Sequence, residues 1–259
     1  MTFSFKKLLW PATLLLSVAV FSATAADLPE TIRAIKPSVV AIGTLVKTRT
    51  PPVVFFGTGF VVGDGLTVVT NSHVVPAILD SEKNETLTIL IERGTTYEQR
   101  PARVIANDKS HDLALLKITG DPLPALKLGD STQAQEGQSL ALTGYPMAIG
   151  LGLHAATHRA VLAAIVSITQ PPPTARQLSP ATINRVRDGS FAIFQLDATS
   201  YPGNSGSPLY DPGSGEVLAI INAGFIKGSK ENALSNPSGI SYAIPSQYIK
   251  ALMQKSQND

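Results

Sequence analysis

The sequence lacks cysteine entirely, and only 15% of its 259 residues are charged. Without cysteine, the chain folds without disulfide bonds in whichever compartment receives it. Neither sign of charge is in excess: when Lys6 and Lys7 of an N-terminal leader are set aside, 19 basic residues remain against 19 acidic ones. This balance gives no indication of a nucleic-acid partner.

Residues 1–25 have the three parts of a secretory signal peptide. Two lysines form a basic region, an apolar run extends from Leu8 to Phe21, and Ala23-Thr24-Ala25 supplies the small residues of a cleavage site. The apolar run is short for a bilayer span, which disfavours a retained anchor. The sequence therefore predicts export, to the periplasm or as a secreted protein, with no stable membrane anchor after cleavage.

Glycine and proline are abundant, with 20 and 19 copies. This turn-rich composition predicts many short strands rather than long helices, and short apolar runs bounded by turn residues recur along the chain. Two strand-rich halves of comparable size then indicate an all-β fold of two packed β-barrels. The first covers about residues 38–130 and the second about 131–245, with a short C-terminal helix over 246–254; together they form one domain over 26–259.

A serine between two glycines marks the most distinctive turn, Gly203-Asn204-Ser205-Gly206. Gly203 has no Cβ, so its N–H and that of Ser205 can both turn toward an oxyanion beside the Ser205 hydroxyl. A serine hydroxyl is a weak nucleophile unless an adjacent base, itself oriented by a third group, accepts its proton. By itself the motif is more often a surface turn between strands, so its chemical meaning depends on a histidine and a carboxylate elsewhere.

His73 and Asp112 are the partners that the sequence offers. His73 follows a β-rich run at the expected rim of a sheet, and Asp112 stands directly before an apolar strand, where a carboxylate can be partly buried and still ionised. Asp108 and Asp130 are rival carboxylates, better explained as turn residues. His111 is the rival base, but the immediate neighbour of Asp112 in an extended chain points to the other side.

Two further histidines, His154 and His158, lie in a glycine-rich loop predicted over about residues 145–159. Gly150 and Gly152 argue against a helix that would align the two rings, and no acidic or thiol partner lies near them in the sequence. We therefore expect no metal site, and no cofactor.

In their order along the chain, these motifs resemble those of the trypsin-like (chymotrypsin-fold) serine proteases, particularly the HtrA/Deg-like branch. The order His, Asp, Ser is that of this family and not of subtilisins or α/β-hydrolases. The resemblance covers nearly the whole mature chain and rests on Gly57-Thr58-Gly59-Phe60, Thr70-Asn71-Ser72-His73-Val74-Val75, His111-Asp112-Leu113-Ala114-Leu115-Leu116-Lys117, Leu128-Gly129-Asp130-Ser131, Asp197-Ala198, Gly203-Asn204-Ser205-Gly206 and Tyr242-Ala243-Ile244-Pro245-Ser246.

The resemblance implies a chymotrypsin-like fold in which both packed β-barrels are six-stranded. It also implies an exported serine endopeptidase that acts on protein or peptide substrates. Ser205 is then the nucleophile that forms an acyl-enzyme, His73 the general acid and base, and Asp112 the carboxylate that fixes the imidazole tautomer. The N–H groups of Gly203 and Ser205 are implied to form the oxyanion hole.

The resemblance also places a primary substrate pocket, with its floor at Thr199 and Ser200 and its walls near Gly224 and Phe225. None of these residues is charged, which disfavours cleavage after lysine or arginine because burying their charge without a partner is costly. Small or medium apolar substrate side chains are the expectation.

Several features depart from the family pattern. No PDZ domain follows the predicted barrels. Ser207 stands where many relatives have a second glycine, which is similar to the glutamyl-endopeptidase branch, yet residues 221–225 hold no histidine that would bind a glutamate side chain. Asn204 replaces the aspartate that trypsin-type zymogens use to capture a new N-terminus. A non-catalytic binding or chaperone module with the same fold, and an esterase with the same triad, remain competing hypotheses; nothing in the sequence indicates the oligomeric state.

Overall fold

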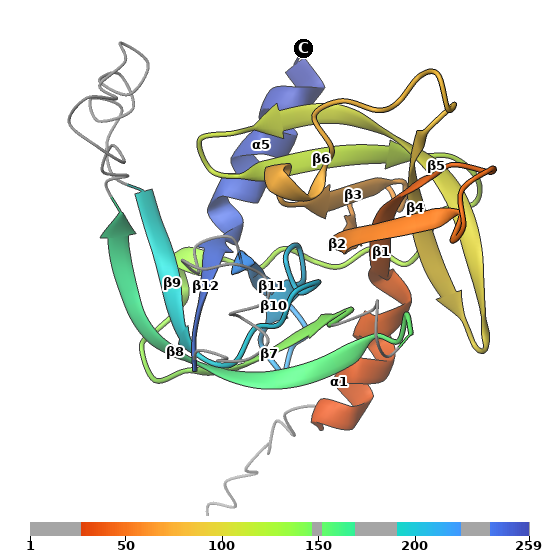
Figure 1. Ribbon diagram of the computed structural model, residues 1–259. Helices are drawn as coiled ribbons and strands as arrows, with labels where there is room; N and C mark the ends of the chain where they lie inside the picture. The colour runs from red at the N-terminus through yellow and green to blue at the C-terminus, as the bar shows by residue number, and fades with distance from the viewer. Residues whose placement is uncertain (1–26, 147–151, 169–190, 224–238, 259) are drawn as a thin grey trace, which may run out of the picture.

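The computed structural model describes residues 27–146, 152–168, 191–223 and 239–258 (Figure 1). The predicted signal peptide lies outside the described residues, as do Gly224 and Phe225 of the predicted pocket wall.

Twelve strands in the described part of the chain close into two antiparallel β-barrels (Figure 1). The first barrel consists of β1 (Val39–Leu45), β2 (Val53–Val62), β3 (Thr67–Thr70), β4 (Thr86–Arg93), β5 (Thr96–Asp108) and β6 (Leu113–Ile118). The second consists of β7 (Ser139–Gly144), β8 (Ala156–Ile168), β9 (Phe191–Asp197), β10 (Pro208–Tyr210), β11 (Val217–Ile221) and β12 (Ile240–Pro245). The predicted all-β fold class is confirmed.

The two barrels share one connectivity. Around the first barrel the strands run β1-β2-β3-β6-β5-β4, and around the second β7-β8-β9-β12-β11-β10, which is the same order displaced by six strands. The sequence contains no repeat of fixed period, so this duplication is evident only in the fold.

Three apolar clusters form the core. One fills the first barrel and another the second, while the largest joins side chains from both barrels. The first four residues of β1 are all apolar because both faces of the strand are buried. Val40 and Ile42 point into the first barrel, whereas Val39 and Ala41 face the shared cluster. Because successive strand residues point to opposite faces, a strand buried on both sides reads as a continuous hydrophobic run.

In the part of the chain that the structure describes, two α-helices flank the barrels. α1 (Leu28–Ile35) precedes the first barrel and is followed by the short 3₁₀ helix η1 (Lys36–Ser38). α5 (Ser246–Asn258) contacts β5 and β6 of the first barrel and β11 and β12 of the second (Figure 1). Its buried Ile249 belongs to the shared cluster, so the C-terminal helix fastens the two barrels together.

The structure extends two elements beyond the sequence-based expectation. The C-terminal helix runs to Asn258 rather than 254. β8 begins at Ala156, inside the segment predicted as a loop to about residue 159, because residues 156–161 pair with β7 from Gly144 back to Ser139. His158 therefore belongs to a strand.

Candidate active site

Strand pairing in the first barrel brings His73 next to Asp112. β3 and β6 are antiparallel with Thr70 opposite Ala114. Continuing this register by two residues places Ser72 opposite Asp112. The Ser72 N–H donates to the Asp112 carbonyl at 3.1 Å, and the 3₁₀ helix η2 (Ser72–Val74) then carries His73. Asp112 has a φ of +53°, an uncommon conformation for a residue with a side chain.

Both oxygens of the Asp112 carboxylate face His73. The His73 ring is bonded through Nδ1 to Oδ2 at 2.6 Å, and the His73 backbone N–H donates to Oδ1 at 2.9 Å. The backbone bond holds the carboxylate beside His73, and the bond to Nδ1 fixes the rotation of the imidazole ring. With Nδ1–H donating its hydrogen bond to Asp112, Nε2 carries a lone pair.

The Ser205 hydroxyl lies at the other side of the same ring, with Oγ 3.0 Å from His73 Nε2. Ser205 belongs to the loop between β9 and β10 of the second barrel, so the three side chains come together across the boundary between the barrels. Ser205 is 7% exposed, whereas the His73 side chain is 40% exposed and open to a substrate. Such an arrangement can carry a proton from the hydroxyl to the imidazole.

A tight turn precedes Ser205. The Asn204 N–H donates to the Tyr201 carbonyl at 3.0 Å, and Gly203 between them has a φ of +102°. Proline followed by glycine at the two central positions, Pro202 and Gly203, is the pattern of a type II turn. The N–H groups of Gly203 and Ser205 have no acceptor within the described residues, which leaves both free to bind an oxygen of a ligand.

Thr58 of β2 connects this turn to the first barrel. Its N–H donates to the Ser205 carbonyl at 2.8 Å, and its hydroxyl donates to the Gly203 carbonyl at 2.7 Å. A Cβ on Gly206 would lie 1.9 Å from the Thr58 carbonyl oxygen, and one on Gly203 would lie 2.3 Å from the Tyr145 carbonyl oxygen. Both glycines are therefore required by close backbone approach as well as by their positive φ.

The two residues that depart from the family pattern lie together behind Ser205. Asn204 and Ser207 are both fully buried, and neither side chain has a hydrogen-bond partner in the described structure. A Cβ on Gly144 would lie 1.9 Å from Ser207 Oγ and 3.1 Å from Asn204 Oδ1. The absence of a side chain at Gly144 thus makes room for serine at position 207.

The rival residues have other partners. His111 is bonded through Nδ1 to Asp108 Oδ2 at 2.6 Å, and its ring stacks on Tyr248 of α5 with the centroids 4.5 Å apart. Asp130 caps the 3₁₀ helix η3 (Ser131–Gln133) by accepting the Thr132 N–H at 3.0 Å. None of the three contacts Ser205.

Sequence reasoning missed Asn222, which supports the Asp112 carboxylate. Its side-chain Nδ2 donates to Asp112 Oδ2 at 2.7 Å, so that oxygen accepts from both His73 and Asn222. Asn222 directly follows the apolar strand β11 and is only 2% exposed. A buried polar side chain at the end of an apolar strand was the available signal, because such groups need a partner.

The predicted pocket floor lies on the chain between β9 and the Tyr201–Asn204 turn. Ser200 is 5% exposed, and its buried hydroxyl has no partner among the described residues; Thr199 is partly buried. The predicted walls, Gly224 and Phe225, lie outside the described residues, so the structure brings together only the floor.

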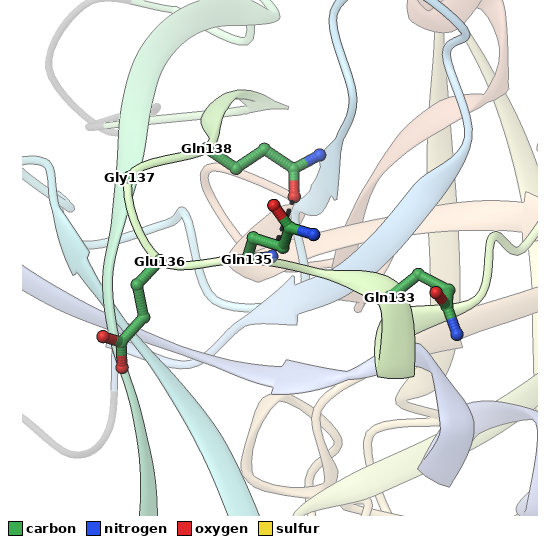
Figure 2. Close-up of a pocket in the computed structure, with 5 residues that line it drawn as sticks. All are labelled: Gln133, Gln135, Glu136, Gly137 and Gln138. Atoms are coloured by element: carbon green, nitrogen blue, oxygen red, sulfur yellow. Dashed lines mark hydrogen bonds between the residues drawn. The ribbon is translucent and has the colours of Figure 1, made fainter.

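A hollow elsewhere in the second barrel has a different character. Figure 2 shows it at the turn between η3 and β7, where Gln135 donates its N–H to the Gln138 side chain at 3.3 Å. Gln138 also donates to Asp211, and Glu136 accepts the Ile165 N–H at 2.8 Å. These bonds hold the turn against its own barrel, and the lining includes none of the three side chains at Ser205.

The family model for the trypsin-like peptidase domain matches residues 57–220, more than half of the chain. The chain belongs to the trypsin-like peptidase family. Among curated relatives of this family member, serine protease HTRA3 of Homo sapiens is 30% identical over 203 residues, covering 78% of this chain and 38% of HTRA3. Serine protease HTRA1A of Danio rerio is 31% identical over 231 residues, covering 88% of this chain and 40% of HTRA1A. These matches confirm the HtrA-like resemblance.

Solved structures agree in fold. The HtrA-type protease AlgW with a decapeptide superposes with a TM-score of 0.64 at 21% identity, covering 90% of this trypsin-like chain and 68% of AlgW. AlgW with a tripeptide gives a TM-score of 0.61 at 23% identity, over 88% of this chain and 63% of that one.

The trypsin-like chain spans about two fifths of the length of these curated relatives. The relatives are named as serine proteases, in agreement with the serine endopeptidase class predicted from the sequence. Within the described ranges, no helix is both long enough and apolar enough to cross a membrane.

Proposed function

We propose that this chain is a serine endopeptidase that cleaves peptide bonds through Ser205, His73 and Asp112. The observation that carries the proposal is the pair of contacts on the two nitrogens of one imidazole. Nε2 lies 3.0 Å from the Ser205 hydroxyl, while Nδ1 lies 2.6 Å from the Asp112 carboxylate. A nucleophile, a base and a group that orients the base are thus within hydrogen-bond reach of one another.

The acylation half of the reaction follows from this geometry. His73 Nε2 accepts the Ser205 proton as Oγ attacks the substrate carbonyl carbon, and Asp112 stabilises the imidazolium that forms. The tetrahedral intermediate collapses when His73 donates that proton to the departing amine, which leaves an acyl-enzyme on Ser205. A water molecule then gives up a proton to His73 as it attacks the ester carbonyl carbon. His73 returns this proton to Ser205 Oγ when the acid departs, which restores the free hydroxyl.

The oxyanion of each tetrahedral intermediate is assigned to the N–H groups of Gly203 and Ser205. Their lack of an acceptor within the described residues supports this role, as does the turn that fixes Gly203. Fixed backbone donors of this kind contribute on the order of 3 kcal/mol each to lowering such barriers.

We also propose that the protein works outside the cytoplasm, after cleavage of residues 1–25, as one protease domain over 26–259. The basic, apolar and small-residue segments of the leader support export. Unfolded or extended protein segments are the substrates that suit a peptide-bond hydrolase whose histidine is open to solvent.

The decisive experiment compares the wild type with Ser205→Ala on an unfolded protein substrate and with a serine-reactive fluorophosphonate. We expect the wild type to cleave and to be labelled, and Ser205→Ala to lose at least about 10⁴-fold in rate and all labelling. Ser207→Ala, two residues further on, is the matched control and should still be labelled. Equal activity in wild type and Ser205→Ala, or an unlabelled wild type, contradicts the proposal. A wild type that is labelled and hydrolyses ester substrates but not peptides is an esterase.

A further inference from the structure

His158 lies on the inner face of the second barrel, at the end nearest to the Ser205 turn. Residues 158, 160 and 162 share one face of β8, and Ala160 and Leu162 belong to the cluster that fills the barrel. β8 pairs with β9 as far as Val161 opposite Asp197, and His158 and Ser200 each lie three residues beyond that last pair. The ring of Tyr201, the next residue, has its centroid 6.1 Å from that of His158.

His158 and Ser200 each place an unpartnered polar atom at this end of the barrel, in addition to the Asn204 and Ser207 side chains behind Ser205. His158 Nε2 and Ser200 Oγ are both buried, and neither makes a hydrogen bond within the described structure. A buried donor or acceptor left unpaired costs about 1–3 kcal/mol, so native structures seldom keep one without a reason. Two such atoms, one on His158 and one on the residue next to Tyr201, indicate a place where a hydrogen-bonding ligand group is received.

This place is connected to the proposed nucleophile. Ser200 is followed directly by the Tyr201–Asn204 turn and then by Ser205, so one short segment carries both. The family resemblance implies that Ser200 belongs to the floor of the primary substrate pocket, which would receive the side chain next to the reacting carbonyl of a substrate acylated at Ser205. The inference rests on the proposed function in this respect.

The surroundings of the His158 imidazole favour its uncharged form. Burial lowers the pKa of His158 below its ordinary value, because the charged form is poorly solvated there. The neighbouring Arg159 is exposed and, as the next residue in the strand, points to the opposite face. A neutral imidazole and a hydroxyl can each donate or accept a hydrogen bond, but they neutralise no ion.

We propose that His158 and Ser200 select substrates with a neutral hydrogen-bonding side chain, a carboxamide or a hydroxyl, on the acyl side of the cleaved bond. Such a group pairs with both buried atoms. An apolar side chain would leave the two atoms unpaired, and a charged one would enter without a counter-charge. This preference replaces the apolar one that the uncharged residues alone suggest.

The test uses peptides that differ in one side chain of matched shape, threonine against valine and glutamine against methionine. We expect kcat/KM to favour threonine and glutamine by at least about tenfold, since sites built around a polar group reject analogues that lack it. His158→Leu and Ser200→Ala should each move the ratios toward one, chiefly by improving the apolar substrates. His158→Gln keeps a hydrogen-bonding side chain and should preserve the preference, and Arg159→Ala is the control on the opposite face.

Valine preferred over threonine, or glutamate over glutamine at pH 7, overturns the inference while leaving the endopeptidase proposal intact. The same holds if all variants slow every substrate equally, which would assign His158 a structural role. Thermal unfolding of each variant shows whether it folds, and Ser200→Ala provides the answer if His158→Leu does not. A wild type that neither cleaves any peptide nor reacts with fluorophosphonate overturns both proposals.

Discussion

The first barrel contains two histidine–aspartate pairs, His73–Asp112 and His111–Asp108, whose internal geometries are nearly the same. In each, the histidine Nδ1 lies 2.6 Å from an aspartate Oδ2, and the histidine N–H donates to Oδ1, at 2.9 Å for His73–Asp112 and 3.2 Å for His111–Asp108. The two aspartates are even of similar exposure, 24% and 27%. The pairs differ in what meets the far side of the ring.

The His73 ring presents Nε2 to the Ser205 hydroxyl, whereas the His111 ring packs between aromatic side chains. Phe191 meets the His111 ring edge-on with centroids 5.0 Å apart, and Tyr248 stacks on it. Phe191 belongs to β9 and Tyr248 to α5, so His111 joins the first barrel to the second and to the C-terminal helix. A well-oriented histidine is therefore no indication of chemistry until its second nitrogen is accounted for.

Replacing each aspartate by asparagine gives the largest contrast. In Asp112→Asn, an amide facing Nδ1 favours the wrong tautomer, so Nε2 no longer accepts a proton, and kcat should fall by about 10⁴-fold. Asp108→Asn makes the same chemical change in the other pair and should alter kcat by no more than a few fold. The measurement is kcat on a peptide substrate for both variants beside the wild type.

A comparable loss in both variants would mean that the two pairs act together. Retained activity in Asp112→Asn would remove Asp112 from the proposed mechanism. Circular dichroism of each variant separates lost chemistry from lost structure.

Asn222→Ala offers a smaller effect on the same pair, because it removes one of the donors to Asp112 Oδ2. Hydrogen bonds to charged groups contribute about 1.5–3 kcal/mol. In the transition state Asp112 faces an imidazolium, so most of this hydrogen-bond free energy should stabilise the transition state rather than bound substrate. For Asn222→Ala, kcat should therefore fall roughly 10- to 100-fold with little change in KM.

Asn71→Ala is the matched control for this prediction. The Asn71 amide donates to the Asp112 main-chain carbonyl at 3.2 Å, not to the carboxylate. It should cost stability more than rate. An Asn222→Ala enzyme with wild-type kcat would show that Asn222 serves only the fold.

Much of the site could be predicted because its residues carry strong local signals. A glycine on each side of the dipeptide Asn204-Ser205 marks a constrained turn, and His73 and Asp112 stand at strand ends where side chains converge. The two barrels could also be predicted from the sequence, because short apolar runs alternate with turn residues at spacings typical of short strands.

What escaped prediction depends on contacts between distant segments. Asn222 looks like any polar residue after a strand until β11 is placed beside the Asp112 loop. His158 was assigned to a loop because the glycines before it suggested that the loop continued, whereas pairing with β7 overrides that local preference. Pairing partners of this kind are set by the tertiary fold and not by neighbouring residues.

The smallest effect concerns how the His111–Asp108 pair responds to acid. Burial raises the pKa of Asp108, but hydrogen bonds from the His111 side chain and backbone outweigh it, so the pKa lies below its ordinary value. A carboxyl whose pKa is depressed on folding stabilises the native state above its unfolded pKa, and the contribution disappears as pH falls through the folded value. Asp108→Asn should therefore lower the free energy of unfolding by a few tenths to about 1 kcal/mol at pH 6, as expected for a partly exposed pair, with the difference vanishing between about pH 4 and pH 2.

Urea unfolding in a Ser205→Ala background, which prevents self-digestion, measures this difference across pH. His111→Phe keeps an aromatic ring against Tyr248 but removes the bond to Asp108, so Asp108→Asn in that background should have a smaller and less pH-dependent effect. An undiminished effect of Asp108→Asn would assign its stability to the turn, where the Asp108 carboxylate also accepts the Ser110 N–H at 2.9 Å. That result would separate the two pairs further, because the His111 ring would then depend on its aromatic neighbours alone, whereas the His73 ring is oriented by its carboxylate.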